Sequence, residues 1–300
     1  MAEFKKEALE IDQQIELLKL KGLIIEDIES ARYWLSFVSY FRLRNYTHTF
    51  KDYENMPLGN FHPNTTFENI IDLYLFDRDL KLIIFDAIET IEVALRTQIS
   101  NRMSCKFGSH WYLNPDHFSE PFDFGRFIEK IIESHDNPDE HFIMAYKKYF
   151  DNPPLAPSWM VMETLSFNKI ALIFQYLIPR EQKLKICEEF KMPEAILSTW
   201  IRCFGFIRNR CAHHSRVVYT AVKFAPRFAS RKSYTFLQDI EDLDANLLYS
   251  SLCCMQYLIR IINPKSKFKS NLIKLIDDSP FINLDKIGFT KNWREENIWK

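Results

Sequence analysis

One stretch of the chain keeps a helical spacing of apolar residues for longer than any other. Between Thr65 and Lys106 the apolar positions recur at intervals of three and four residues, and Gly108 follows. Thr65 and Glu68 have the spacing of a capping box at the start of this helix. A helix of this length, which rises about 1.5 Å per residue, crosses a whole domain. The remaining elements must therefore pack along it.

The residue usage also favours helices over sheets. The 300 residues include 6 glycines, whereas average usage of about 7% would give about 21. Sheet-rich folds use glycine in tight turns and bulges. With 47% hydrophobic and 26% charged residues, the chain has the composition of a folded protein with a sizeable core. We therefore expect an all-α fold.

The same spacing argument predicts further helices and the division of the chain. They are expected over 4–18, 27–40, 124–134, 140–150, 159–178, 180–190, 193–218 and 237–262. Gly22 is expected to end the first of these helices, and Asp27 and Ser158 are expected to cap those over 27–40 and 159–178. The stretch from Tyr46 to Pro63 has little periodicity and contains loop residues. We expect a helical N-terminal region over 1–62, a helical domain over 63–264 and a peripheral segment over 265–300.

Nothing in the sequence indicates export or membrane insertion. Met1 to Lys6 leads into a charged amphipathic stretch without the apolar core of a signal peptide. The most apolar windows, 170–178 and 247–262, are shorter than the roughly 20 residues that span a bilayer. The six cysteines show no CxxC pair. We expect a cytoplasmic protein with buried, reduced thiols and no membrane contact.

The near-neutral total charge conceals a basic segment. No acidic residue occurs in the 44 positions from Ala195 to Gln238, so this window carries +8, while 31 basic and 40 acidic residues elsewhere leave −9. A local basic field suits a polyanion such as RNA, although a solvated basic surface or pairing with acidic neighbours would look the same. The eight basic residues are Arg202, Arg208, Arg210, Arg216, Lys223, Arg227, Arg231 and Lys232.

A group of polar residues within this window has the composition of a catalytic site. Asn209 and His213 are four residues apart and would share one face of a helix, whereas Arg208 points about 140° away from His213. Arg208 must therefore curl around the helix or meet a histidine from a second copy. A composite site across a two-fold interface, in a homodimer, would satisfy this geometry.

The chemistry that these groups suit is RNA cleavage without a metal or other cofactor. The 2′-hydroxyl is an internal nucleophile, so the protein supplies a proton acceptor and donor and a cation for the developing charge. His213 suits the first role and Arg208 the second, and Asn209 could orient either group. His214 and Arg96 are candidate auxiliary groups. The competing interpretation is an ordinary polar helix face.

Several other patterns have simpler explanations. Cys203, Cys211, His213 and His214 lack the close cysteine pairs of a structural zinc site, so no metal is expected. Glu92 and Arg96 have the spacing of a helical ion pair that orients the core.

The remaining patterns are weaker still. Arg42 and His48 repeat the basic–histidine spacing without further support, and Tyr40, Arg42 and Tyr46 fit either base stacking or core packing. Trp293 and Trp299 are expected to be packing anchors. No helix-turn-helix pattern supports a DNA-binding regulator.

The sequence resembles a known family at several places in a fixed order. "RNRCAHHSR" resembles the "RNxCAHHxR" signature of the Abi (AbiD/AbiF-type) abortive-infection family of bacteria, and the same segment resembles the R-x4-6-H motif of HEPN-domain ribonucleases. The likeness covers about 11–262. It also includes QIELLKLKGLII (14–25), YFRLRNY (40–46), FENIIDLYLFDRDLK (67–81), IETIEVALRTQI (88–99) and SWMVMETLSF (158–167).

The resemblance implies an all-helical HEPN-type bundle that is usually dimeric and cleaves RNA without metal in defence against phage. Arg208, Asn209 and His213 occupy the catalytic motif positions of that family. Some HEPN proteins instead lack nuclease activity and bind RNA or a protein partner, so a non-catalytic module is the alternative. An antitoxin or a small RNA would be a further partner of such a toxin.

Overall fold

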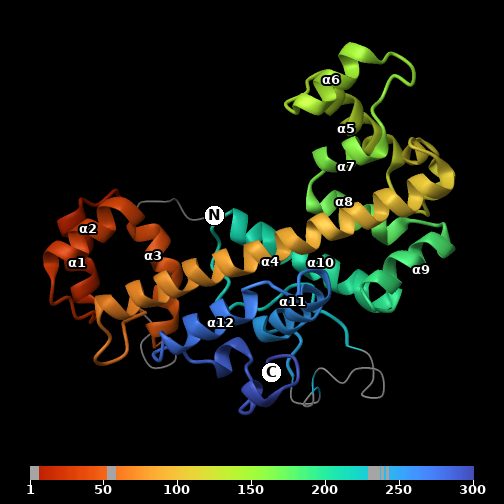
Figure 1. Cartoon of the computed structure of the whole chain (residues 1–300). Coiled ribbons are helices and arrows are strands. Elements are labelled where there is room, and N and C mark those ends of the chain that lie inside the picture. Colours follow the sequence, from red (N-terminus) through yellow and green to blue (C-terminus); the bar gives the residue numbers. More distant parts are fainter. Residues whose placement is uncertain (1–6, 53–58, 229–236, 238–239, 241–242) are drawn as a thin grey trace. The chain divides into compact units, whose positions relative to one another are not determined.

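The computed structural model describes residues 7–52, 59–228, 237, 240 and 243–300 (Figure 1). The described residues form helices and contain no strand, which confirms the all-α fold class. The α-helices are α1 (Ile11–Leu20), α2 (Ile28–Val38), α3 (Tyr40–Thr47), α4 (Phe67–Phe107), α5 (Phe124–Asp136), α6 (His141–Tyr149), α7 (Ser158–Thr164), α8 (Phe167–Tyr176), α9 (Arg180–Glu189), α10 (Glu194–Ala212), α11 (Leu248–Ile262) and α12 (Phe268–Asp277).

The chain divides into two compact units. Unit 1 consists of 1–81 and 275–282, and unit 2 of 82–274 and 283–300. The long helix expected after Thr65 is present as α4, which contributes its first turns to unit 1 and the rest to unit 2. The candidate site residues of the basic window all belong to unit 2. The boundaries expected at 62/63 and 264/265 stay predictions.

In unit 1, α1 ends in the manner that the sequence predicts. Gly22 has φ +86°, and the N–H groups of Gly22 and Leu23 donate to the carbonyls of Lys19 and Leu18. This is a Schellman motif, which places glycine in the left-handed conformation just after a helix. The start of α1 is later than expected, because a capping box between Glu10 and Gln13 fixes it at Ile11. Phe4, in the expected first turn, lies outside the described residues.

A buried polar cluster holds α3 against the first turns of α4 in unit 1. The Tyr46 hydroxyl donates to Oδ2 of Asp77 at 2.8 Å, and Nζ of Lys81 pairs with the same oxygen at 2.9 Å. Burial, followed by the Asp77 charge, raises the pKa of Tyr46. Tyr46 is 1% exposed, so it packs in the core and is not free to stack on bases.

The cap of α4 differs from the expected one by one residue. The backbone N–H of Asn69 donates to Oγ1 of Thr66, and the Thr66 N–H donates to Oδ1 of Asn69. The reciprocal pair is therefore Thr66 and Asn69, not Thr65 and Glu68. Thr65 is turned away because its hydroxyl donates to the carbonyl of His62.

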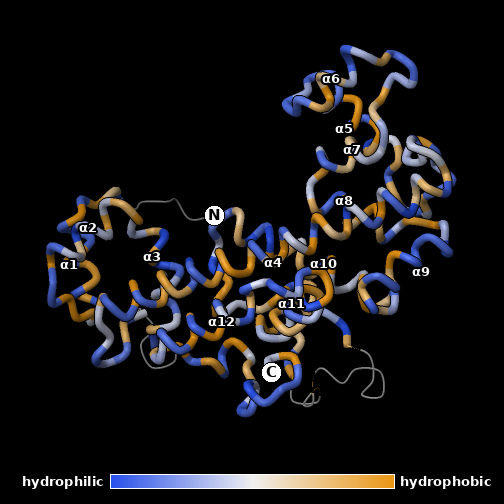
Figure 2. Tube along the Cα trace, viewed as in Figure 1, coloured by the Kyte–Doolittle hydropathy of each residue, from blue (hydrophilic) through white to orange (hydrophobic). Residues whose placement is uncertain are grey.

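In unit 2, α10 packs against α8, α9 and α11. Figure 2 shows hydrophobic residues concentrated around α10 and α11. Gly205 of α10 faces Asn168 of α8, and a Cβ at this position would lie 2.5 Å from the Asn168 Oδ1. The missing side chain thus lets α8 and α10 approach closely. Most of the apolar side chains of α10 are fully buried, which fixes the position of its last turn.

The helix expected over 159–178 is interrupted between α7 and α8. α7 ends at Thr164, and Leu165 and Ser166 adopt extended backbone conformations before α8 begins. The Leu165 carbonyl leaves the helical pattern and accepts a hydrogen bond from Arg96 at 3.0 Å. At this point the Leu165 carbonyl forms a hydrogen bond with a residue of α4 in place of a helical one, and the helix is interrupted. Ser158 is the first residue of α7 and not its cap, which is Pro157.

The helix expected over 237–262 begins at Leu248. Part of the expected first half, residues 238–239 and 241–242, lies outside the described residues. The described remainder turns before the helix, since the N–H of Leu247 donates to the carbonyl of Asp244. Val222 also donates to the Asn246 carbonyl at 2.7 Å. Because this hydrogen bond to a distant segment occupies the Asn246 carbonyl, the residues before Leu248 do not continue the helix.

The C-terminal segment contributes aromatic side chains to the core of unit 2. Trp293 and Trp299 are 5% and 3% exposed, which confirms them as packing anchors. The indole N–H of Trp299 donates to the Tyr249 hydroxyl at 3.1 Å.

Two further predictions from the sequence concern the burial of the cysteines and the presence of membrane-spanning helices. Five of the six cysteines are buried as expected, but Cys105 is exposed. None of the described helices has the length and the apolar character that crossing a membrane requires.

Candidate active site at the end of α10

The last turn of α10 closes with a Schellman motif that uses histidine in place of glycine. His214 has φ +55°, and its N–H donates to the Cys211 carbonyl at 3.0 Å. The Ser215 N–H donates to the Arg210 carbonyl at 2.8 Å. These are the two hydrogen bonds that define the motif. Because a residue with a Cβ is strained in the left-handed region, His214 holds a conformation that glycine adopts more readily.

The helix ends before the histidines, so the expected arrangement on one helical face needs correction. The prediction continued the helix to Val218, whereas α10 stops at Ala212 and His213 is the capping residue. The His213 N–H still donates to the Asn209 carbonyl at 2.9 Å, so these two residues remain one turn apart. His213 and His214 are both exposed, and Arg208 and Asn209 are half-buried. The capped helix end thus presents two imidazoles to solvent.

Arg208 lies against one face of α4. Its guanidinium carbon is 5.7 Å from the centroid of the Phe85 ring. Its charge also acts on the Glu92 carboxyl, two turns further along α4. Phe85, Glu89, Glu92 and Arg96 occupy one side of that helix because they are separated by three or four residues. Arg208 therefore interacts with a group of charged residues on α4. These residues lie outside the sequence motif that runs from Arg208 to His213.

Arg96 organises this cluster. Its guanidinium pairs with Glu92 at 2.7 Å, which confirms the expected ion pair, and with Glu163 of α7 at 3.0 Å. It also donates to the Leu165 carbonyl. Burial raises the pKa of Glu92, the Arg96 and Arg208 charges oppose this rise, and Glu89 adds to it. Arg96 is 8% exposed, so it positions its neighbours rather than offering a free cation.

The residues that follow the two histidines, from Val217 to Tyr219, are fixed by contacts with the rest of unit 2. Val217 and Val218 are buried in the core. The Tyr219 hydroxyl accepts a hydrogen bond from the Asn283 N–H at 2.8 Å. Together with the Schellman motif, these contacts fix both ends of the short turn that carries His213 and His214.

Part of the basic window forms a cluster of cations and aromatic rings. The guanidinium of Arg202 lies 4.0 Å from the centroid of the Phe224 ring, and Nζ of Lys223 lies 5.5 Å from the same centroid. The Phe224 ring meets the Phe206 ring edge to face at 5.8 Å. Arg210 lies 5.7 Å from the Phe206 centroid. We call these five residues the α10 cation–aromatic cluster.

The structure does not gather every predicted site residue on one face. Positions 202, 206 and 210 share one side of α10, and Arg208 is displaced from them by roughly 120–160° at about 100° per residue. Arg210 also donates to the Arg216 carbonyl, so it helps to close the helix end. Arg227 is anchored through its backbone, which bonds to Thr199 and Trp200. Arg231 and Lys232 lie outside the described residues.

Comparison with known proteins places the chain in a family. The family model for Abi-like proteins matches residues 33–219, which include α10 and its capped end. This chain belongs to the Abi-like protein family. No curated protein and no solved structure matches it. Membership of the Abi-like family suggests a role in abortive infection.

The described residues of this Abi-like protein include no group of three or more His, Cys, Asp or Glu side chains arranged to bind one metal ion. The thiols next to the histidines in sequence belong to the core. Cys203 is buried and contacts the Ser251 hydroxyl at 3.2 Å, and burial raises the pKa of this thiol to about 12.

Sequence reasoning missed two residues that shape the environment of Arg208 in this Abi-like protein. Glu163 lies within one of the segments that carry the family resemblance, so its position held a signal that was not used. Phe85 carried no signal, because an apolar residue at helical spacing on α4 looks like any other core residue. Its 37% exposure and its position beneath Arg208 emerge only from the fold.

Proposed function

We propose that this Abi-like protein is a metal-independent endoribonuclease of the HEPN type that acts as a toxin in abortive infection against phage. The observation that carries the proposal is the end of α10, where His213 is exposed on a capped turn and Arg208 is held by α4. Both groups come from one motif and are fixed by separate parts of unit 2. Fixed polar groups of this kind stabilise a transition state without reorganisation.

The proposed reaction starts from the 2′-hydroxyl of the RNA. His213 accepts the proton of this hydroxyl as the oxygen attacks the adjacent phosphorus, and the bond to the 5′-oxygen breaks. A second imidazole, or protonated His213 itself, donates a proton to the leaving 5′-oxygen. Arg208 stabilises the additional negative charge on the phosphate, and Asn209 orients a phosphate oxygen. The products are a 2′,3′-cyclic phosphate and a 5′-hydroxyl.

A second copy of the chain would complete this site. Leu82, Phe85 and Val93 are exposed apolar residues within about 80° of one another around α4, on the side where Phe85 contacts Arg208, and we call them the α4 apolar stripe. Glu89 is also exposed on this side. A stripe of this kind on a helix surface is suited to burial against an identical helix around a two-fold axis. Such a dimer would bring Arg208 of one copy towards His213 of the other. Such a dimer would fit the spacing of Arg208 and His213, which are five residues apart and therefore about 140° apart around the helix.

The α10 cation–aromatic cluster would bind the RNA strand on the way to this site. Single-stranded RNA is held by cations along its backbone and by aromatic rings that stack on bases. Arg202 and Lys223 are exposed and would contact phosphates. Binding is therefore expected to weaken as salt concentration rises.

The experiment that tests the activity uses purified protein, RNA and EDTA. Wild-type protein should produce fragments that end in a 2′,3′-cyclic phosphate, and His213→Ala should lose this activity by a factor of about 100 or more. The control is His141→Ala, which removes an exposed histidine at the start of α6. Cleavage that requires a divalent ion, or that persists in His213→Ala, would exclude the mechanism.

A non-catalytic module that binds RNA or a protein is the second candidate. The observation that favours it is the packing of Arg208 over Phe85 and its charge interaction with Glu92, because these contacts give the motif arginine a structural role. Induced expression in bacteria separates the two candidates. A toxin arrests growth in the wild-type form and not as His213→Ala, whereas equal growth of both would favour the binding module.

A further inference from the structure

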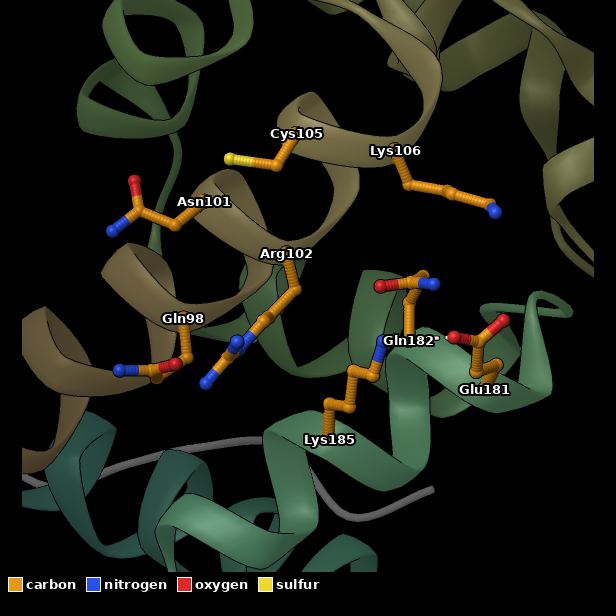
Figure 3. Close-up of a pocket in the computed structure, with 8 residues that line it drawn as sticks. All are labelled: Gln98, Asn101, Arg102, Cys105, Lys106, Glu181, Gln182 and Lys185. Carbon is orange, nitrogen blue, oxygen red and sulfur yellow. Dashed lines mark hydrogen bonds and ion pairs between the residues drawn. The ribbon is translucent and has the colours of Figure 1, made fainter.

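A second polar surface of unit 2 lies between the C-terminal half of α4 and the start of α9. It is a cleft of about 450 Å³, which we call the α4–α9 cleft (Figure 3). This volume lies within the range of roughly 300–1,000 Å³ that small-ligand sites occupy. α9 contributes Glu181, Gln182 and Lys185, and α4 contributes Gln98, Asn101, Arg102, Cys105 and Lys106.

The cleft is separate from the candidate active site. Its α4 residues at 98, 101, 102 and 105 lie roughly opposite the side that carries Phe85, Glu92 and Arg96, at about 100° per residue. The two surfaces therefore face different directions from the same helix. None of the residues proposed for RNA cleavage lines the cleft.

The cleft contains more cationic charge than its carboxylates balance. Arg102 bonds to Glu189 of α9, and Lys185 pairs with Glu181 at 2.7 Å. Lys106 forms no ion pair within the described part of the chain. Its charge acts on Glu181, whose pKa is lowered first by the hydrogen bond and charge of Lys185 and then by Lys106. One positive charge is thus available for an anionic group.

Side-chain amides supply the rest of the polar lining. Gln98, Asn101 and Gln182 each present a carbonyl oxygen and an NH₂ group, which can accept and donate hydrogen bonds. Gln182 is 4% exposed, and Figure 3 shows its carboxamide directed into the space between the two helices. A buried amide aimed into a cleft is suited to hydrogen bonding with a ligand.

We propose that the α4–α9 cleft binds a ribonucleotide. The phosphate would lie against Lys106 and Arg102, and the base and ribose would hydrogen bond with the three amides. An inorganic anion would use the cation and leave the amides without partners, whereas a nucleotide uses both. The nucleotide would come either from the free mononucleotide pool or from one residue of an RNA strand. The proposal does not rest on the ribonuclease mechanism, because it concerns different residues.

Cys105 provides a direct measurement of occupancy. It is the one exposed thiol among the six cysteines, and it lines the cleft. Alkylation of the native protein with iodoacetamide should therefore label Cys105 first. A bound nucleotide would cover the thiol and slow this labelling.

The experiment measures the Cys105 labelling rate, together with calorimetric binding, in the presence of AMP, GMP, CMP, UMP or a short RNA. The His213→Ala protein is used throughout, so that RNA stays intact whether or not the cleavage proposal holds. Lys106→Gln and Asn101→Ala change exposed side chains of the cleft, and Lys148→Gln is a matched control on α6. Loss of one charge-assisted hydrogen bond weakens binding about tenfold or more.

The experiment distinguishes a free mononucleotide from one residue of an RNA strand. Saturable protection of Cys105 by a mononucleotide, weakened about tenfold by Lys106→Gln and not by Lys148→Gln, supports a free nucleotide. The same pattern with RNA alone supports a residue of an RNA strand. Absence of protection and of saturable binding by all five probes at millimolar concentration overturns the proposal. Binding that Lys106→Gln and Asn101→Ala leave unchanged overturns it as well.

Discussion

The guanidinium carbon of Arg208 lies 5.7 Å from the ring centroid of Phe85, on the face of α4 that also carries Glu92 and Arg96. The motif arginine is therefore positioned by a helix more than a hundred residues earlier in the chain. A planar guanidinium over an aromatic ring keeps its edge available for a bidentate contact with phosphate. The same placement brings its charge to the Glu92 carboxyl, which gives a measurable consequence.

Removing the Arg208 charge should raise the pKa of Glu92 further above its ordinary value. Burial already raises this pKa, and Arg208 is one of two cations that oppose the rise. In Arg208→Ala the folded protein would hold the Glu92 proton to higher pH than the unfolded chain. The free energy of unfolding would then fall as pH increases from the ordinary carboxyl pKa through the folded one.

NMR titration of the Glu92 carboxyl, with denaturation across the same pH range, measures both effects. Arg202→Ala is the matched control, because Arg202 lies about 120° around α10 from Arg208 and contacts Phe224. An unchanged Glu92 pKa in Arg208→Ala would show that the two groups do not interact.

Replacing Arg96 should lower the free energy of unfolding more than replacing its exposed acidic partner Glu163. In Arg96→Met the half-buried Glu92 loses its cation and the Leu165 carbonyl loses its donor, which we expect to cost about 3 kcal/mol. Glu163→Gln should cost less than about 1 kcal/mol, because the Glu163 side chain is 49% exposed. Urea denaturation compares the two variants. Equal losses would contradict the central role assigned to Arg96.

His214 should be replaceable by glycine without loss of stability. The left-handed backbone at φ +55° is strained for histidine, and relief of this strain offsets the greater freedom of glycine in the unfolded chain. We expect His214→Gly to equal wild type or exceed it by up to about 1 kcal/mol, and His214→Val to be destabilised by about 1 kcal/mol or more.

Cleavage by the same variants shows whether the imidazole has a role beyond closing the helix. RNA cleavage that is lost in a stable His214→Gly protein assigns His214 to the chemistry. Cleavage at the wild-type rate would remove it from the candidate auxiliary groups. Thermal unfolding, measured alongside, keeps a folding defect from being mistaken for a catalytic one.

A charge on the apolar stripe of α4 should prevent dimer formation. Val93 is exposed, so Val93→Glu is expected to fold normally while placing two carboxylates in the proposed two-fold interface. Light scattering should give a dimer for wild type and a monomer for Val93→Glu. Leu172→Glu, at an exposed apolar position on α8, is the control and should remain dimeric. A monomeric wild type would exclude the composite site.

Elements set by local pattern were predicted well. The long apolar period of α4, the Asp27 cap of α2 and the left-handed Gly22 after α1 each depend on residues that are neighbours in sequence. Two of the errors came where distant groups compete with helical hydrogen bonds. The Leu165 carbonyl leaves its helix for Arg96, and Val222 holds Asn246 outside α11.

The sequence by itself determined the helical class, the basic window and the polar motif from Arg208 to His214, because composition, charge and spacing are local properties. Only the tertiary structure decided where those groups face. It left the histidines exposed to solvent and placed Arg208 over Phe85. It also formed the α4–α9 cleft from residues about eighty positions apart in the chain. Packing between helices sets the distances between residues that are far apart in the chain, and these distances cannot be derived from their spacing in the sequence.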